Sequence, residues 1–182
     1  AGAEVAPTIL VTMGGSDPEG MTMKAVEALD GLEGAFKPVV VVGSAFSRRA
    51  ELADLLKRVR RPFDVRCDVR DMAELMSQAD LTVASFGVTA YELAAMGVPA
   101  IYLCLTEDHF RHAGVFADAG IALNLGLHYS VEPSAIGEKV SELLSDRTRL
   151  KAMGFRTKNL VDGRGAERIA QIISDRSRKN HG

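Results

Sequence analysis

Hydrophobic residues along this chain fall into short runs separated by amphipathic stretches. The runs are bounded mostly by Gly, Pro, Ser or Asp, which is typical of strands, and they lie at residues 8–13, 37–42, 63–66, 81–84, 100–105 and 121–125. Helical periodicity marks the stretches 19–32, 47–60, 72–78, 88–96 and 109–119, and two further helices are expected at 133–145 and 166–176. The pattern predicts alternating strands and helices.

Several of the expected strands are apolar at consecutive positions instead of alternate ones. Such strands are buried on both faces, as in a parallel sheet with helices above and below it. The sequence therefore predicts an α/β fold with a Rossmann-like, doubly wound parallel sheet of six strands.

Composition narrows the function classes. With 182 residues, of which 47% are hydrophobic, the chain can build one core. Its net charge of −2 provides no positive potential that would attract the phosphates of a nucleic acid. Cys67 and Cys104 lie in apolar or strand-like surroundings without CxxC spacing, so we expect buried free thiols and a cytoplasmic protein. No apolar run is long enough to span a membrane, and no signal peptide is visible.

The turn after the first expected strand contains Gly14 and Gly15, which let a ligand approach the backbone. Asp17 and Pro18 suit the start of a helix, whose free amides favour phosphate. Alternatively, the two glycines only permit a tight turn. The second strand ends in residues 42–44 without an acidic residue, and no GxGxxG is present, which argues against a dinucleotide dehydrogenase.

The turn after the fourth expected strand repeats this arrangement. Ser85, Gly87 and Thr89 place small residues and hydroxyls at a second helix N-terminus, where they can donate to phosphate oxygens. Glu92 follows Thr89 by one helical turn, and its carboxylate could accept hydrogen bonds from two ribose hydroxyls. The simpler alternative is that Thr89 caps the helix and Glu92 is a solvated helix residue. Both turns are expected at the same edge of the sheet.

Three motifs in this order carry a family resemblance. The segment "ADLTVASFGVTAYELAAMGVPAIYL" resembles the nucleotide-sugar motif of glycosyltransferase family 28 C-terminal domains. The segments "ILVTMGGSDPEG" and "VDGRGAERI" resemble the nucleotide-sugar hydrolase of pseudaminic acid synthesis and spore-coat polysaccharide proteins. The resemblance covers residues 8–173 and implies the C-terminal, donor-binding half of a GT-B fold.

The resemblance also implies roles for particular residues. It sets the pyrophosphate of a UDP-sugar against the two glycine turns, at Gly14, Gly15, Ser16, Gly87, Val88 and Thr89. It places the ribose at Glu92 and the uracil near the end of the third strand, at Cys67, Asp68, Val69 and Met72. The turn at 106–110 would face the sugar, and there Asp108 and His109 stand where relatives often have Asn and Gln or paired Gln. Catalytic residues are not assigned.

No metal or separate cofactor is expected, because His109 and His112 lack a nearby third ligand. We expect a linker remnant at 1–7, the nucleotide-sugar-binding domain at 8–176 and a flexible tail at 177–182. In GT-B enzymes the other half supplies the acceptor pocket, so an N-terminal acceptor domain is expected as a partner, and this chain alone is expected to be inactive. Three readings stay open: the donor half of a glycosyltransferase, the donor half of a UDP-sugar hydrolase, or a binding subunit without chemistry.

Overall fold

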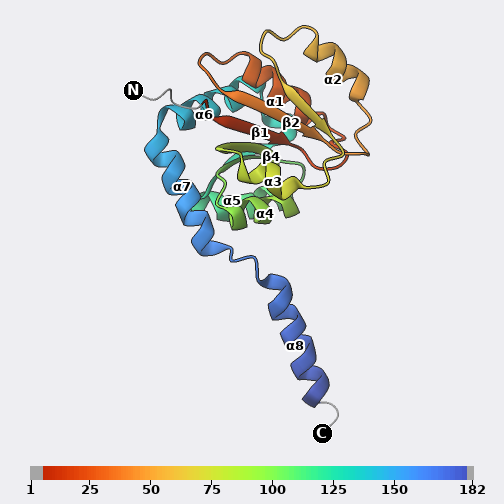
Figure 1. Cartoon of the computed structure of the whole chain (residues 1–182), viewed down its shortest axis with the longest axis vertical. Helices are drawn as coiled ribbons and strands as arrows, with labels where there is room; N and C mark the ends of the chain where they lie inside the picture. The colour runs from red at the N-terminus through yellow and green to blue at the C-terminus, as the bar shows by residue number, and fades with distance from the viewer. Residues whose placement is uncertain (1–5, 180–182) are drawn as a thin grey trace.

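The computed structural model describes residues 6–179, and a six-stranded parallel sheet lies at its centre (Figure 1). The strand order is β3-β2-β1-β4-β5-β6, with every neighbouring pair parallel. The strands are β1 (Thr8–Thr12), β2 (Lys37–Val42), β3 (Asp64–Cys67), β4 (Leu81–Ser85), β5 (Ala100–Cys104) and β6 (Ala122–Leu127). The order reverses between β1 and β4, and open α/β sheets bind ligands at such a point.

A helix follows each of the first five strands, and further helices follow the sixth. The connecting helices are α1 (Met21–Asp30), α2 (Arg49–Leu56), α3 (Met72–Ser77), α4 (Val88–Met96) and α5 (Glu107–Asp118). After β6 come the short 3-10 helix η1 (His128–Ser130), then α6 (Pro133–Ser145), α7 (Arg147–Leu160) and α8 (Gly165–Lys179).

Both faces of the sheet are buried, as the consecutive apolar positions predicted. Ile9 and Val11 of β1 join a core with α1, α2 and α6, whereas Leu10 between them joins a second core with α3, α4 and α5. Alternate strand residues pack in opposite directions because successive β-carbons point to opposite faces. The Rossmann-like, doubly wound sheet is therefore confirmed.

Helix α7 is the element that the sequence did not predict. Its segment RTRLKAMGFRTKNL is rich in Arg and Lys and shows little helical periodicity. The helix is held by tertiary packing, because Leu150 and Met153 are buried and Gly154 approaches the turn after α4 closely. A β-carbon on Gly154 would lie 2.7 Å from the carbonyl oxygen of Gly97. Asp146 caps the helix by accepting a hydrogen bond of 2.8 Å from the amide of Arg149.

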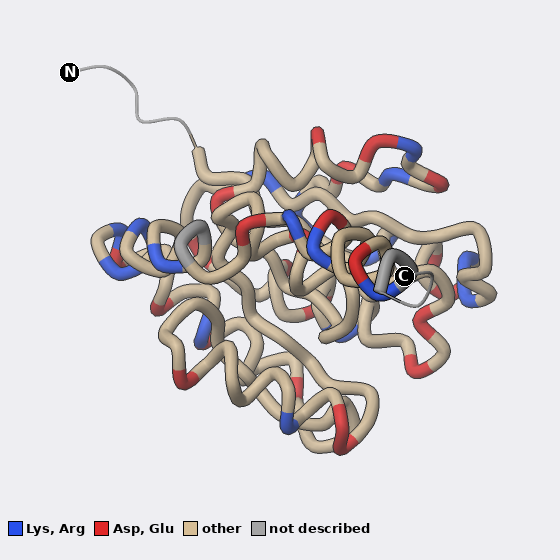
Figure 2. The backbone as a smooth tube through the Cα atoms, turned by 90° about the horizontal axis from the view of Figure 1, so that it is seen from below, with Lys and Arg blue, Asp and Glu red and all other residues tan. Residues whose placement is uncertain are grey.

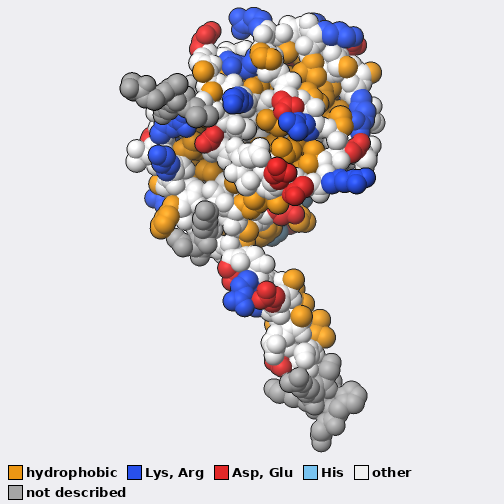
Figure 3. Space-filling model, viewed as in Figure 1, with side chains coloured by type: hydrophobic (Ala, Val, Ile, Leu, Met, Phe, Trp, Pro, Cys, Tyr) orange, Lys and Arg blue, Asp and Glu red, His pale blue; other side chains and the backbone are white. Residues whose placement is uncertain are grey.

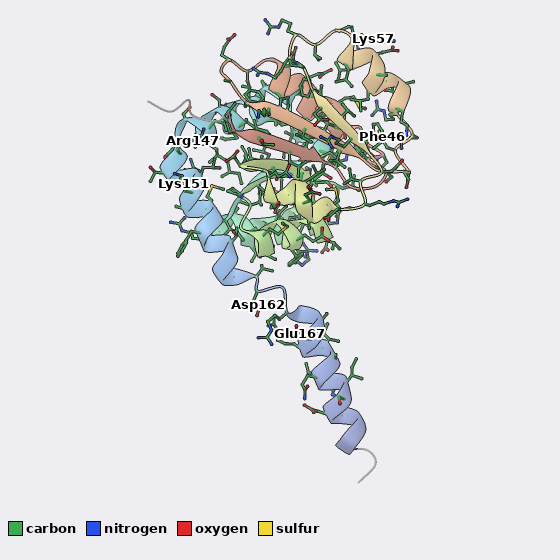
Figure 4. The ribbon with its side chains drawn as sticks, in the orientation of Figure 1. Phe46, Lys57, Arg147, Lys151, Asp162 and Glu167 are labelled. Carbon is green, nitrogen blue, oxygen red and sulfur yellow. The ribbon has the colours of Figure 1, made fainter. Side chains whose placement is uncertain are left out.

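Helix α8 extends away from the sheet (Figure 1), and its apolar side chains line one side of it (Figure 3). Ile169, Ile172 and Ile173 are all more than half exposed. The turn before the helix holds Asp162, whose carboxylate accepts from Arg168 at 2.6 Å, and Glu167 lies just beyond it (Figure 4). The helix continues through Lys179, so the tail expected at 177–182 begins inside a helix, and residues 1–5 and 180–182 lie outside the described residues.

Charged residues of both signs are spread around the molecule (Figure 2), in line with the small net charge of −2. Within residues 6–179, no helix combines the length and the apolar character that crossing a membrane would require.

Candidate functional site

The turns after β1 and β4 meet at the carboxyl edge of the sheet. Thr12 of β1 pairs with Ala84 of β4, so both strands end at the same level. A β-carbon on Gly14 would lie 3.8 Å from the hydroxyl oxygen of Ser85. Gly14 has a positive φ of 80°, which glycine adopts without strain. The structure therefore brings the two predicted glycine turns together at the point where the strand order reverses.

The first turn differs from the prediction in one respect, because the N-terminus of α1 is not free. Asp17 is 2% exposed, and its carboxylate accepts from the amides of Met21 and Thr22 at 2.9 and 2.8 Å. The helix consequently begins at Met21, after Gly20, and not at residue 19. The expectation of free amides at this terminus was wrong. What the turn presents to solvent is the exposed segment 14–16.

The N-terminus of α4, by contrast, carries no cap. Gly87 precedes the helix with an extended backbone, no side chain caps it, and its first turn contains no acidic residue. The amides of Gly87, Val88 and Thr89 donate to no acceptor within the described residues. Because of these free donors and the helix dipole, the N-terminus of α4 carries a partial positive charge at the carboxyl edge of the sheet.

A cavity of about 450 Å³ connects these turns with the segment after β3. It is lined by Thr12, Gly14, Gly15, Val41, Val42, Gly43, Ser44, Asp68, Val69, Met72, Met76, Thr89 and Glu92. Of the predicted residues, the cavity brings together Gly14, Gly15, Asp68, Val69, Met72, Thr89 and Glu92, whereas Cys67 at the end of β3 does not line it. Ser16, Ser85, Gly87 and Val88 belong to the same turns but do not line the cavity.

The cavity has an apolar side and a polar side. Val69 and Met72 are half-buried and lie beside the buried Met76, a surface against which a flat ring can pack. Glu92 is exposed, and none of the described side chains forms an ion pair with it. Its carboxylate is therefore available as a hydrogen-bond acceptor beside Thr89 and the free end of α4.

The turn after β2 supports the turn after β1. A β-carbon on Gly43 would lie 2.5 Å from the carbonyl oxygen of Gly15, so the two backbones are in direct contact. Phe46, labelled in Figure 4, is 2% exposed and anchors this turn in the core. From the sequence, residues 42–44 indicated only the absence of an acidic residue for a dinucleotide ribose. The glycine itself was the overlooked signal.

Asp108 and His109 lie in the first turn of α5, after β5, and do not line the cavity. Thr106 caps α5 by accepting from the amide of His109 at 3.2 Å, so this helix begins at Glu107. The Asp108 carboxylate is engaged by Arg111 at 2.8 Å. His109 is half-buried with its ring 6.2 Å from that of Phe86, and its Nδ1 has no hydrogen-bond partner among the described residues. Within residues 6–179 no three His, Cys, Asp or Glu side chains form a metal-binding group.

The two cysteines occupy different environments. Cys104 is buried on β5, between β4 and β6, and burial raises the pKa of its thiol to about 11. Cys67 is exposed, which corrects the expectation that both thiols are buried. The reason is its position at the end of β3, the outermost strand of the sheet.

Comparison with known proteins identifies the class to which this fold and site belong. The fold is that of the C-terminal half of GT-B glycosyltransferases: the crystal structure of Acinetobacter baumannii MurG superposes with a TM-score of 0.79 at 20% identity, covering 95% of this chain and 51% of that one. Residues 8–170 match the glycosyltransferase family 28 C-terminal domain. The chain belongs to this family, as its three motifs predicted.

Two relatives show how much of a longer protein the chain corresponds to. The spore coat polysaccharide biosynthesis protein SpsG of Bacillus subtilis is 31% identical over 92% of this chain and 50% of its own length. A UDP-N-acetylglucosamine--N-acetylmuramyl-(pentapeptide) pyrophosphoryl-undecaprenol N-acetylglucosamine transferase of Halorhodospira halophila is 30% identical over 94% of this chain and 49% of its own length. The chain thus spans about half the length of these relatives.

Proposed function

We propose that this chain binds the nucleoside diphosphate part of a nucleotide sugar, with UDP as the nucleotide, and serves as the donor half of a glycosyltransferase in polysaccharide or glycoconjugate synthesis. One observation carries the proposal: the uncapped N-terminus of α4, the free carboxylate of Glu92 and the apolar wall of Val69 and Met72 border one cavity. The name of the H. halophila relative supports UDP.

Each part of the cavity suits one part of the ligand. We assign the pyrophosphate to the amides of segments 14–16 and 87–89, because backbone donors and a helix dipole favour anions. Glu92 accepts from the ribose hydroxyls, and Val69 and Met72 pack against the base. The cavity lining contains no Lys or Arg. Backbone donors therefore carry the stabilisation of the diphosphate charge, and we propose no metal or additional cofactor.

In the proposed reaction an acceptor displaces the nucleoside diphosphate from the anomeric carbon of the sugar. The N-terminus of α4 stabilises the negative charge that develops on the departing diphosphate. The acceptor site and the general base are assigned to a second, N-terminal domain, a partner supported by relatives about twice as long as this chain. The two free thiols support a reducing, cytoplasmic location.

A second candidate is the donor half of a UDP-sugar hydrolase. The observation in its favour is the turn sequence GGSDP, in which Asp17 holds the start of α1. The two reactions differ in the group that receives the sugar, so release of UDP by the two-domain protein is the deciding measurement. Release that depends on an acceptor identifies a transferase, and release in water alone identifies a hydrolase. UDP binding without release in either case would identify a subunit that only binds.

Titration calorimetry of this chain with UDP tests the proposal. We expect saturable binding of one UDP per chain, weaker than in a two-domain protein because half of the cleft is absent. UMP should bind more weakly, since it lacks the phosphate that reaches the second turn. The absence of heat with any uridine diphosphate compound at millimolar concentration would overturn the proposal.

A further inference from the structure

We propose that Arg49 is a positioning residue that sets the preference of the cavity for its nucleobase, an inference that rests on the proposed function. The guanidinium of Arg49 joins two parts of the cavity wall. Its Nη2 donates to the carbonyl oxygen of Gly43 at 2.9 Å and lies 3.7 Å from a carboxylate oxygen of Asp68. Gly43 and Asp68 both line the cavity, whereas Arg49 does not.

The contact with Gly43 connects Arg49 to the phosphate side of the cavity. Gly43 backs directly onto Gly15, with a virtual β-carbon distance of 2.5 Å to the Gly15 carbonyl oxygen. Gly15 in turn belongs to the turn proposed for the pyrophosphate. A hydrogen bond to a charged donor contributes more than a neutral one, so the bond from Arg49 holds the turn after β2 in place.

The contact with Asp68 connects Arg49 to the base side. Asp68 has a positive φ of 51°, a conformation that residues with a side chain rarely adopt. Its amide donates to the carbonyl oxygen of Val42 at 3.2 Å, and its carboxylate faces Arg49. Val69 follows directly and forms part of the apolar wall. Without Arg49, Asp68 can leave this conformation and carry Val69 with it.

The position of Arg49 in its own helix indicates the same role. Arg49 is the first residue of α2, where a positive charge opposes the helix dipole. Its neighbour Arg48 is bonded to Glu51 within the same turn at 2.6 Å, whereas the guanidinium of Arg49 reaches back to Gly43 after β2 and across to Asp68 after β3. An arginine at this position thus does not stabilise the helix. Its contacts with Gly43 and Asp68 instead stabilise the wall of the cavity.

The side chains of Arg49 and Asp68 are 43% and 55% exposed, and exposed ion pairs contribute little to the stability of a fold. Replacing Arg49 should therefore leave the fold intact, which permits a direct test. The variants are Arg49→Met, Arg49→Lys and the control Arg66→Met, which removes an exposed arginine that is bonded to Asp64 on β3 and does not itself line the cavity. Calorimetry measures the affinity of each for UDP and for ADP, and calorimetric melting measures stability.

We expect Arg49→Met to bind UDP about tenfold more weakly, while its affinity for ADP changes by less than about twofold. The ratio of UDP affinity to ADP affinity should therefore fall. Arg49→Lys should recover part of the preference, and Arg66→Met should match the wild type. An unchanged UDP to ADP ratio in Arg49→Met would overturn the inference, because a purely structural role would weaken both nucleotides equally. A wild-type chain that binds no nucleoside diphosphate would overturn the proposed function, and this inference with it.

Discussion

Gly43 touches Gly15 so closely that a β-carbon on Gly43 would lie 2.5 Å from the Gly15 carbonyl oxygen and 2.6 Å from its Cα. Neither backbone can yield without moving the turn that we assign to the pyrophosphate. The shape of the cavity thus depends on glycine at position 43, which lies after β2 and outside the glycine-rich turn that follows β1.

Replacing Gly43 with alanine should push the first turn out of place. We expect Gly43→Ala to lose about 1–3 kcal/mol in the free energy of unfolding, the usual cost of overpacking, and to bind UDP at least about tenfold more weakly. The matched control is Gly114→Ala in α5, where a β-carbon meets no atom within 4 Å. It should keep its UDP affinity and gain stability. Equal UDP affinity in the two variants would refute the role given to Gly43.

The buried carboxylate of Asp17 holds the start of α1 through two amides. Asp17→Ala should lower the free energy of unfolding by about 2–4 kcal/mol in urea titrations, because it leaves two buried donors without an acceptor. Asp146→Ala provides the comparison, since this exposed cap of α7 accepts a single bond and should cost about 1 kcal/mol. If both variants lose the same stability, Asp17 contributes no more than an ordinary cap.

Substitution of Glu92 distinguishes its two possible roles, a contact to the ribose and a solvated helix residue. We expect Glu92→Ala to weaken UDP binding by about 1.5–3 kcal/mol, the range for hydrogen bonds with a charged partner, and to change stability by less than about 0.5 kcal/mol. Calorimetry with UDP and 2′,3′-dideoxy-UDP gives the decisive comparison. The wild type should distinguish the two ligands and the variant should not. If neither protein distinguishes them, the ribose does not lie at Glu92.

The two thiols should differ in reactivity. Cys67 is exposed, while Cys104 is buried with a thiol pKa raised to about 11, which leaves it as the unreactive thiol at pH 8. Titration of the native protein with a thiol reagent at pH 8 should therefore modify one cysteine, and unfolding in denaturant should release the second. Rapid modification of both thiols in the native protein would contradict the burial of Cys104.

The sequence predicted most of the sheet because its apolar runs end at residues that break strands. The strand at 37–42 and the helix at 133–145 have the predicted bounds, and the other five strands differ from prediction by one or two residues at their ends. Helix α7 was missed because its stability comes from contacts distant in sequence, such as the approach of Gly154 to Gly97. Periodicity within one segment cannot report such a contact.

The site was predictable to the extent that topology determines it. Gly14 and Glu92 meet at one cavity because parallel strands end at a common edge, which the alternation of strands and helices already implied. Asp17 was predicted at the start of the helix, but its bonds to the amides of Met21 and Thr22, four and five residues further on, depend on positive φ values at Asp17 and Gly20 that the sequence does not reveal. The support of Gly15 by Gly43 depends on the distance between two turns that only the folded chain shows.

The central claim is that a nucleoside diphosphate occupies the cavity between these turns. Chemical-shift mapping of the backbone amides of this chain during titration with UDP tests it most directly. We predict saturable shifts for the amides of Gly14, Gly15, Val69, Val88 and Thr89, and none on α7. Shifts confined to another surface, or none at millimolar UDP, would contradict the account.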